Sequence, residues 1–151
     1  MTQQEITIED ALVFTTNAFR GFKDKGGNPY IHHCIRVMMA VESYGYMYMI
    51  VALMHDVLED TKYTVEDLWH IGVPEKCIEA IIALTKTKNM SKLDSAKLAA
   101  RNPISKIVKI ADLRDNMNLS RIKNHTEADI ERNKKYSIAL NYLLNIKSEK
   151  I

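Results

Sequence analysis

The sequence contains few cysteines, little net charge and no long apolar run, and each of these shortages excludes a class of protein. Its two cysteines, Cys34 and Cys77, match neither a zinc-binding spacing nor a disulfide framework, so we expect free thiols in a reducing, cytoplasmic compartment. A formal charge of +2 is too small for a large nucleic-acid footprint, although it is compatible with a small anionic ligand. The longest apolar run, Met47 to Met54, is too short to span a membrane, and the opening MTQQEITIED does not resemble a signal peptide. We therefore expect neither nucleic acid nor a membrane as partner.

Strand-like alternation is also missing, and helical patterns take its place. Apolar residues recur three and four positions apart, and glycine, proline and polar breaks divide the chain into segments. At 151 residues the chain is long enough to bury a core as one domain. The sequence therefore predicts an all-α fold, a single-domain bundle of about seven or eight helices over residues 1–151. The side chains that we expect to begin helices are Thr7, Thr64, Ser91 and Thr126.

One predicted helix, roughly Met47 to Asp60, runs from an apolar stretch into the polar sequence HDVLED. On a continuous helix, residues four apart share a face, so His55 should lie beside Glu59. By the same spacing, Asp56 should lie beside Asp60. Three carboxylates this close repel one another strongly in a low dielectric, and a divalent cation would relieve that repulsion. The alternative is that these residues form the solvated end of an amphipathic helix.

Two further segments place metal-binding residue types in helical surroundings. In PYIHHC, His32 and His33 follow a glycine-rich turn at the start of a helix. In KIADLRDNM, Asp112 interrupts an apolar row, where a carboxylate is costly to bury unless it is paired or binds a metal. The alternatives are a structural histidine in the first segment and a salt bridge from Asp112 to Arg114 or to a lysine in the second.

The order histidine, then histidine–aspartate, then aspartate resembles the HD-domain metal-dependent phosphohydrolases. More narrowly, three segments resemble the hydrolase domain of RelA/SpoT-type alarmone enzymes and its stand-alone small relatives. These segments are DKGGNPYIHHCIRVM, ALMHDVLEDT and VKIADLRDNMNLSR, and KKYSIAL near the C-terminus is also typical of that family. The resemblance covers nearly the whole chain. It implies an HD-type helical fold and a hydrolase.

The resemblance also implies roles for individual residues. The implied metal ligands are His33, His55, Asp56 and Asp112, with Mn²⁺ as the usual ion. His32 falls on a variable position of the family pattern. Glu59 and Asp60 match an acidic pair that orients or deprotonates the attacking water. Lys25 and Asn116 match residues close to the substrate, although Lys25 could equally be a solvated loop lysine.

The implied reaction is hydrolysis of the 3′-pyrophosphate of ppGpp or pppGpp, giving GDP or GTP and pyrophosphate. The chain leaves no room for a synthetase domain beside the hydrolase, so we expect hydrolysis alone. Two alternatives stay open: the same machinery acting on another phosphorylated nucleotide, such as the 2′-phosphate of NADPH, and a non-catalytic nucleotide-binding regulatory module. The acidic pair argues against the last, because binding alone does not need it. Homo-oligomerisation is also left open by the sequence.

Several positions depart from the family pattern. Asp24 stands where the family often has an arginine that stacks on guanine, and an aspartate cannot stack. Cys34 replaces a common proline, and Phe19 replaces a histidine. The segment ADLRDN differs from the ADRLHN of the long alarmone enzymes. We therefore expect the metal site to match the family well and the selectivity for guanine to be reduced.

Overall fold

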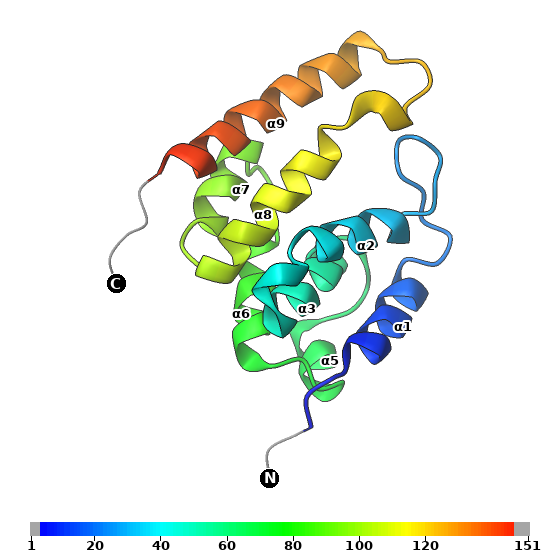
Figure 1. The fold of residues 1–151 in the computed structure, drawn as a ribbon, viewed down its shortest axis with the longest axis vertical. Coiled ribbons are helices and arrows are strands. Elements are labelled where there is room, and N and C mark those ends of the chain that lie inside the picture. Colours follow the sequence, from blue (N-terminus) through cyan, green and yellow to red (C-terminus); the bar gives the residue numbers. More distant parts are fainter. Residues whose placement is uncertain (1–3, 147–151) are drawn as a thin grey trace.

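Helices make up nearly all of the regular structure in the computed structural model, which describes residues 4–146 (Figure 1). Among these residues the only β-type pairing is an isolated bridge between Lys23 and Pro29. The predicted all-α class is therefore confirmed. None of the helices in this range is both long enough and apolar enough to cross a membrane. The α-helices are α1 (Ile8–Ala18), α2 (Ile31–Ala40), α3 (Tyr46–Met54), α4 (Val57–Asp60), α5 (Val65–His70), α6 (Glu75–Leu84), α7 (Lys92–Ala99), α8 (Pro103–Asn116) and α9 (Glu127–Asn145), with short 3₁₀ helices η1 (Glu42–Tyr44) and η2 (Leu119–Arg121).

Polar caps begin the helices where the sequence indicates. Thr64, Ser91 and Thr126 each form a reciprocal capping box with an aspartate three positions further on. Thr7 makes one half of such a box, because its hydroxyl accepts from the Asp10 N–H without a return bond. These bonds satisfy backbone N–H groups that have no partner within the helix.

The predicted helix from Met47 to Asp60 is not continuous. It divides into α3 and α4, with a turn at His55 and Asp56, where Asp56 has φ −104° and ψ 1°. At this turn His55 Nδ1 lies 2.6 Å from the carbonyl oxygen of Ala52. Asp56 groups with Glu59 and Asp60, as the four-residue spacing of Asp56 and Asp60 predicts, while the continuous helix that was expected to place His55 beside Glu59 is interrupted.

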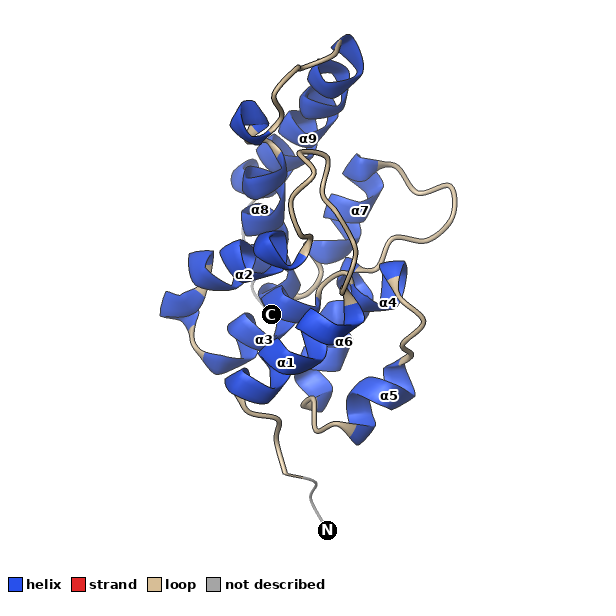
Figure 2. Cartoon of the chain, turned by 90° about the vertical axis from the view of Figure 1, so that its right-hand side faces the viewer, coloured by secondary structure: helices blue, strands red, loops and turns tan. Residues whose placement is uncertain are grey.

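Helix α3 is the centre of the larger of two apolar clusters. Its residues from Ile50 to Met54 are fully buried and pack among α1, α2, α6 and α8 (Figure 1). A smaller cluster of Ala96, Leu113, Ala139 and Leu143 joins α7, α8 and α9, which lie side by side (Figure 2). Because α8 packs in both clusters, it holds the two groups of helices together. Cys34 and Cys77 are buried free thiols, as predicted.

Candidate metal centre

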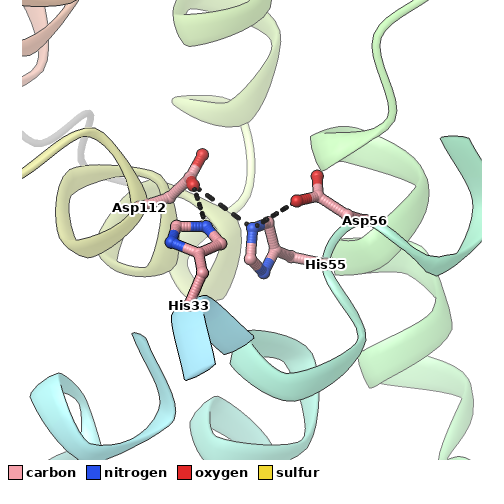
Figure 3. Close-up of side chains that lie close together, drawn as sticks. All are labelled: His33, His55, Asp56 and Asp112. Atoms are coloured by element: carbon pink, nitrogen blue, oxygen red, sulfur yellow. Dashed lines mark hydrogen bonds and ion pairs between the residues drawn. The ribbon is translucent and has the colours of Figure 1, made fainter. Parts of the chain in front are cut away.

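Four side chains that lie far apart in the sequence meet between α2, the α3–α4 turn and α8 (Figure 3). We call His33, His55, Asp56 and Asp112 the metal centre; each offers a ligand atom, and these atoms all lie within 4.8 Å of one another. Asp112 Oδ1 lies 2.9 Å from His33 Nε2 and 3.2 Å from His55 Nε2. The second contact of His55 Nε2 is Asp56 Oδ2, at 3.0 Å. The structure thus brings together all four residues that the resemblance implies as ligands.

The environment of one atom, His55 Nε2, indicates whether the metal centre can hold a metal ion. His55 Nε2 is buried, and it forms no hydrogen bond with any described residue, although two carboxylates lie close to it. A buried polar atom without a hydrogen bond is costly unless another partner takes its place. Two imidazoles and two carboxylates form a donor set that suits a divalent ion of intermediate softness. The residues present can therefore hold a divalent metal.

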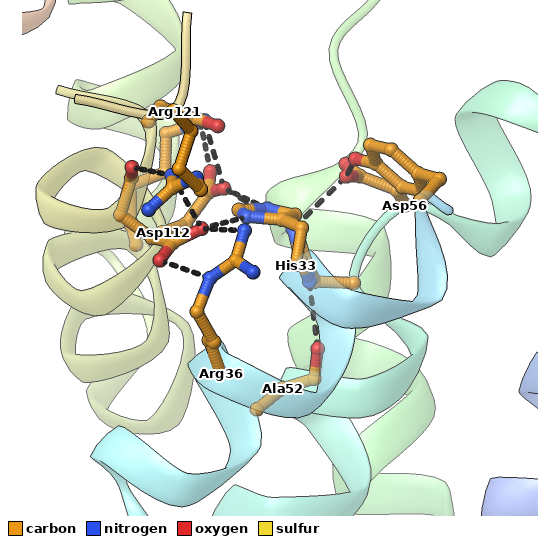
Figure 4. A network of polar contacts seen from close by, with 11 residues as sticks. His33, Arg36, Ala52, Asp56, Asp112 and Arg121 are labelled. Carbon is orange, nitrogen blue, oxygen red and sulfur yellow. Dashed lines mark hydrogen bonds and ion pairs between the residues drawn. The ribbon is translucent and has the colours of Figure 1, made fainter. Parts of the chain in front are cut away.

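Each member of the metal centre has a further partner that orients it (Figure 4). The partners are Asp115 Oδ2 for His33 Nδ1 (2.6 Å), the Ala52 carbonyl for His55 Nδ1 (2.6 Å), the Tyr30 hydroxyl for Asp56, and Lys109 Nζ and Asn116 Nδ2 for Asp112 (3.4 and 3.1 Å). Such partners hold metal-binding side chains in one orientation. From the sequence we considered a salt bridge from Asp112 to a lysine, and that lysine is Lys109. The ion pair uses Asp112 Oδ2, while Oδ1 contacts the two histidines of the metal centre.

Charge and burial act in opposite directions on the carboxylates of the centre. Burial alone would raise the pKa of Asp112, but the charges of His55 and Lys109 lower it well below its usual value. At Asp56 burial is the largest single effect and would raise the pKa, but the charge of His55 and the Tyr30 hydroxyl help to lower it below its usual value. Burial alone would lower the pKa of His55, and the two carboxylates raise it. Both acids are therefore ionised at neutral pH and available as oxygen donors.

A cavity of about 500 Å³ opens beside the metal centre. Its wall includes seven of the eight side chains predicted for the site, and His55 lies buried outside the lining. The predicted residues in the wall are Lys25, His33, Asp56, Glu59, Asp60, Asp112 and Asn116. The volume is suited to a small ligand of nucleotide size.

Glu59 and Asp60, the acidic pair, lie at the edge of the cavity on α4 and group with Asp56. Glu59 Oε1 accepts a hydrogen bond of 2.7 Å from the backbone N–H of Lys86, and burial is the main cause that raises its pKa. Burial and then the charge of Asp56 raise the pKa of Asp60 to about 6. A carboxylate with a pKa near neutrality is suited to accept a proton.

The loop that carries Lys25 is organised by Asp24. One oxygen, Asp24 Oδ1, accepts backbone N–H bonds of 2.9 Å from both Gly26 and Asn28. Gly26 has no space for a side chain, because a Cβ there would collide with the backbone carbonyl of Arg121. Asp24 therefore stabilises the loop. From the sequence we considered this residue only as a replacement for a stacking arginine and did not predict this role.

Apart from Lys25, the sequence reasoning missed a group of cations that line the cavity. We call Lys25, Lys86, Lys92 and Arg132 the cationic wall, and all four line the cavity. Burial lowers the pKa of Lys92, and the charges of Lys86, Lys25 and Arg132 are among those that lower it further. These residues come from separate loops and helices, so no local spacing indicates them. Lys109 and Asp115, in contrast, are each three positions from Asp112, so helical spacing could have identified both.

Comparisons with known proteins identify relatives of the chain. No protein-family model matches the chain. The guanosine-3′,5′-bis(diphosphate) 3′-pyrophosphohydrolase MESH1 of Drosophila melanogaster is 29% identical over 125 residues, which cover 77% of this chain and 69% of that protein. The GTP pyrophosphokinase of Streptomyces coelicolor is 29% identical over 124 residues, 76% of this chain but 15% of that much longer protein. A solved structure described as a metazoan ortholog of SpoT that hydrolyzes ppGpp superposes with a TM-score of 0.76 at 22% identity, covering 96% of this chain and 89% of that one. The fold matches that structure, and the resemblance to the stand-alone alarmone hydrolases is confirmed.

Proposed function

We propose that this chain, which resembles the stand-alone alarmone hydrolases in sequence and in fold, hydrolyses the 3′-pyrophosphate of ppGpp or pppGpp with a divalent metal. One observation carries the proposal: the metal centre, the acidic pair and the cationic wall all meet at one cavity. The Drosophila relative is named for this reaction. The proposal includes Mn²⁺ as the ion, a cytoplasmic location and a single domain over residues 1–151, of which 1–3 and 147–151 lie outside the described residues.

The four side chains of the metal centre would hold the ion through two imidazole nitrogens and two carboxylate oxygens. The ion would supply Lewis-acid chemistry, because it polarises a phosphoryl oxygen and makes a bound water more acidic. Asp60, with its pKa of about 6, accepts the proton of the attacking water. Glu59 is anchored to the Lys86 backbone at 2.7 Å, and it orients that water from the same edge of the cavity.

The substrate is strongly anionic, and the cationic wall would balance its charge. Lys25 and Lys92 line the cavity from separate elements, the loop before α2 and the first residue of α7. Positive charge at a concave surface attracts phosphate groups over a distance and holds them by charge-assisted hydrogen bonds. Asn116 donates through Nδ2 to Asp112, which leaves its amide oxygen for a polar contact to the nucleoside. The oxygen of the attacking water then bonds to the phosphorus that carries the 3′-oxygen, the bond between that phosphorus and the 3′-oxygen breaks, and the 3′-oxygen takes up a proton, which gives GDP or GTP and pyrophosphate.

A second candidate is removal of a phosphate from another nucleotide, such as the 2′-phosphate of NADPH. The observation in its favour is Asp24, whose carboxylate is used within its own loop and which cannot stack on a purine. Without a stacking contact the cavity selects phosphate groups more strongly than it selects a base.

The test is an activity screen of the purified protein with added Mn²⁺ over ppGpp, pppGpp, NADPH and common nucleotides, with products separated by chromatography. We expect GDP and pyrophosphate from ppGpp, and loss of both after chelation. Dephosphorylation of NADPH without cleavage of ppGpp would favour the second candidate. Binding of nucleotides without any turnover would favour a regulatory module and would contradict both.

A further inference from the structure

Asp115, on α8, contacts a member of the metal centre although neither the sequence pattern nor the resemblance assigns it a role. Its Oδ2 lies 2.6 Å from His33 Nδ1, and its Oδ1 accepts a hydrogen bond of 2.7 Å from Arg36 Nε. Arg121 adds contacts of 2.5 Å to the Asp115 backbone oxygen and 3.3 Å to Oδ2 (Figure 4). One carboxylate therefore accepts from an imidazole and from two guanidinium groups.

His33 lies between two carboxylates, with Nδ1 facing Asp115 outside the metal centre and Nε2 facing Asp112 inside it, so a metal bound at the centre can replace a proton only on Nε2. Two arginines keep the Asp115 carboxylate ionised, and an ionised carboxylate only accepts hydrogen bonds. Its short contact with His33 Nδ1 is favourable only if Nδ1 carries a proton. With a metal bound, the lone pair of the neutral ring then lies on Nε2, which faces Asp112 Oδ1 at 2.9 Å, inside the metal centre.

We propose that Asp115 is a positioning residue for the metal centre, which holds His33 in the form that has Nδ1 protonated and Nε2 free to bind a metal. The proposal rests on the proposed function for the presence of a metal at this place. It assigns Arg36 and Arg121 the task of holding Asp115 itself. The segment ADLRDN, whose aspartate at 115 replaces the histidine of ADRLHN, supplies the carboxylate.

The contact between Asp115 and His33 is more buried than a surface ion pair, which supports a positioning role for Asp115. Arg36 is about one-third exposed, with a side-chain accessibility of 34%, and an ion pair to such a group contributes little by itself. The contact between His33 and Asp115 is much more buried, because the two side chains are only 3% and 13% accessible. A buried hydrogen bond to an ionised group is stronger and fixes the plane of the ring.

The test compares Asp115→Asn with wild type by Mn²⁺ titration and by histidine ¹⁵N spectra of the Zn²⁺-loaded proteins. An asparagine keeps the shape, but its amide N–H can donate to Nδ1 and thereby allow the proton to move to Nε2. We expect wild-type His33 to carry its proton on Nδ1, and the variant to lose about 10- to 100-fold in Mn²⁺ affinity. Glu131→Gln, which removes one exposed carboxylate on α9, is the matched control and should bind Mn²⁺ as wild type does.

The outcomes distinguish this proposal from the proposed function. Equal Mn²⁺ affinity in Asp115→Asn and wild type would overturn the positioning role and leave the hydrolase proposal intact. A wild-type protein that binds no divalent ion would overturn both. If the variant fails to fold, the wild-type spectrum decides alone, because a proton on His33 Nε2 in the Zn²⁺-loaded protein contradicts the proposal.

Discussion

The metal centre forms a buried and anchored side of the cavity, whereas the cationic wall presents cations from loops and helices. His33, His55 and Asp112 are at most 5% exposed and come from elements that pack around the larger apolar cluster. Lys25 and Lys86 are exposed, and they belong to connecting segments. A buried ligand has one position set by packing, while an exposed cation can move and be replaced by its neighbours. Substitutions should therefore abolish function on the first side and reduce it gradually on the second.

The largest effect is expected at the metal centre, where the paired histidines offer a matched comparison. His33→Ala should reduce metal loading and turnover to background, because it removes a buried ligand. His32→Ala changes the neighbouring exposed histidine and should leave both unchanged. Metal analysis of the purified proteins measures loading, and pyrophosphate release from ppGpp measures turnover. Loss of metal from His32→Ala alone would mean that the two histidines have been assigned the wrong way round.

The acidic pair should give the next largest effect and separates chemistry from metal binding. Glu59→Gln and Asp60→Asn keep the shape of each side chain but remove its capacity to accept a proton. Turnover should fall by about 100-fold, the usual effect of losing a general base, while metal loading stays at the wild-type level. If either variant loses its metal, that residue belongs with the ligands. Full activity would exclude the residue from the mechanism.

On the cationic wall the expected effects are smaller and lie in KM. Lys92→Gln removes a partly buried cation that faces the cavity and stands 5.1 Å from the ring centroid of Tyr136. We expect KM for ppGpp to rise about 10-fold, equivalent to ~1.4 kcal/mol, with metal loading and kcat unchanged. The control is Lys134→Gln, an exposed lysine on α9 whose side chain is 68% accessible. A KM that responds equally to both substitutions would contradict a specific role for the wall.

The smallest effect is expected at Asp24. Asp24→Asn keeps the oxygen that accepts from Gly26 and Asn28 and removes the charge, so KM should fall by about threefold as repulsion of phosphate weakens. Asp24→Arg introduces a stacking group but loses both backbone hydrogen bonds, at a cost of about 1 kcal/mol each in stability. Thermal unfolding and steady-state kinetics measure the two effects. A more stable arginine variant would show that Asp24 does not organise the loop.

Base selectivity at the same position is a related measurement. Because Asp24 cannot stack, wild type should prefer ppGpp over its adenosine counterpart by less than about 30-fold in kcat/KM. A preference above about 100-fold would exceed what one absent stacking contact allows. The prediction of reduced selectivity for guanine would then be wrong.

The difference between the two sides of the cavity also explains what the sequence could predict. Helical spacing and short motifs identified His55, Asp56 and Asp112, because these residues lie in apolar segments whose periodicity is visible in one dimension. The break between α3 and α4 was missed, because neither His55 nor Asp56 is a residue that ends a helix by itself, and the contact of His55 Nδ1 with the Ala52 carbonyl is visible only in the structure. Lys92 was missed because only tertiary packing brings α7 to the cavity.

The most direct test of the single-metal centre is a titration of Mn²⁺ into metal-free protein while pyrophosphate release from ppGpp is followed. Four ligands around one position predict that activity is absent without metal, rises with each addition and saturates at about one ion per chain. Asp112→Asn should abolish the rise in activity, because it replaces the carboxylate that lies between both histidines with a neutral amide. Hydrolysis that persists unchanged after complete removal of metal would contradict the account.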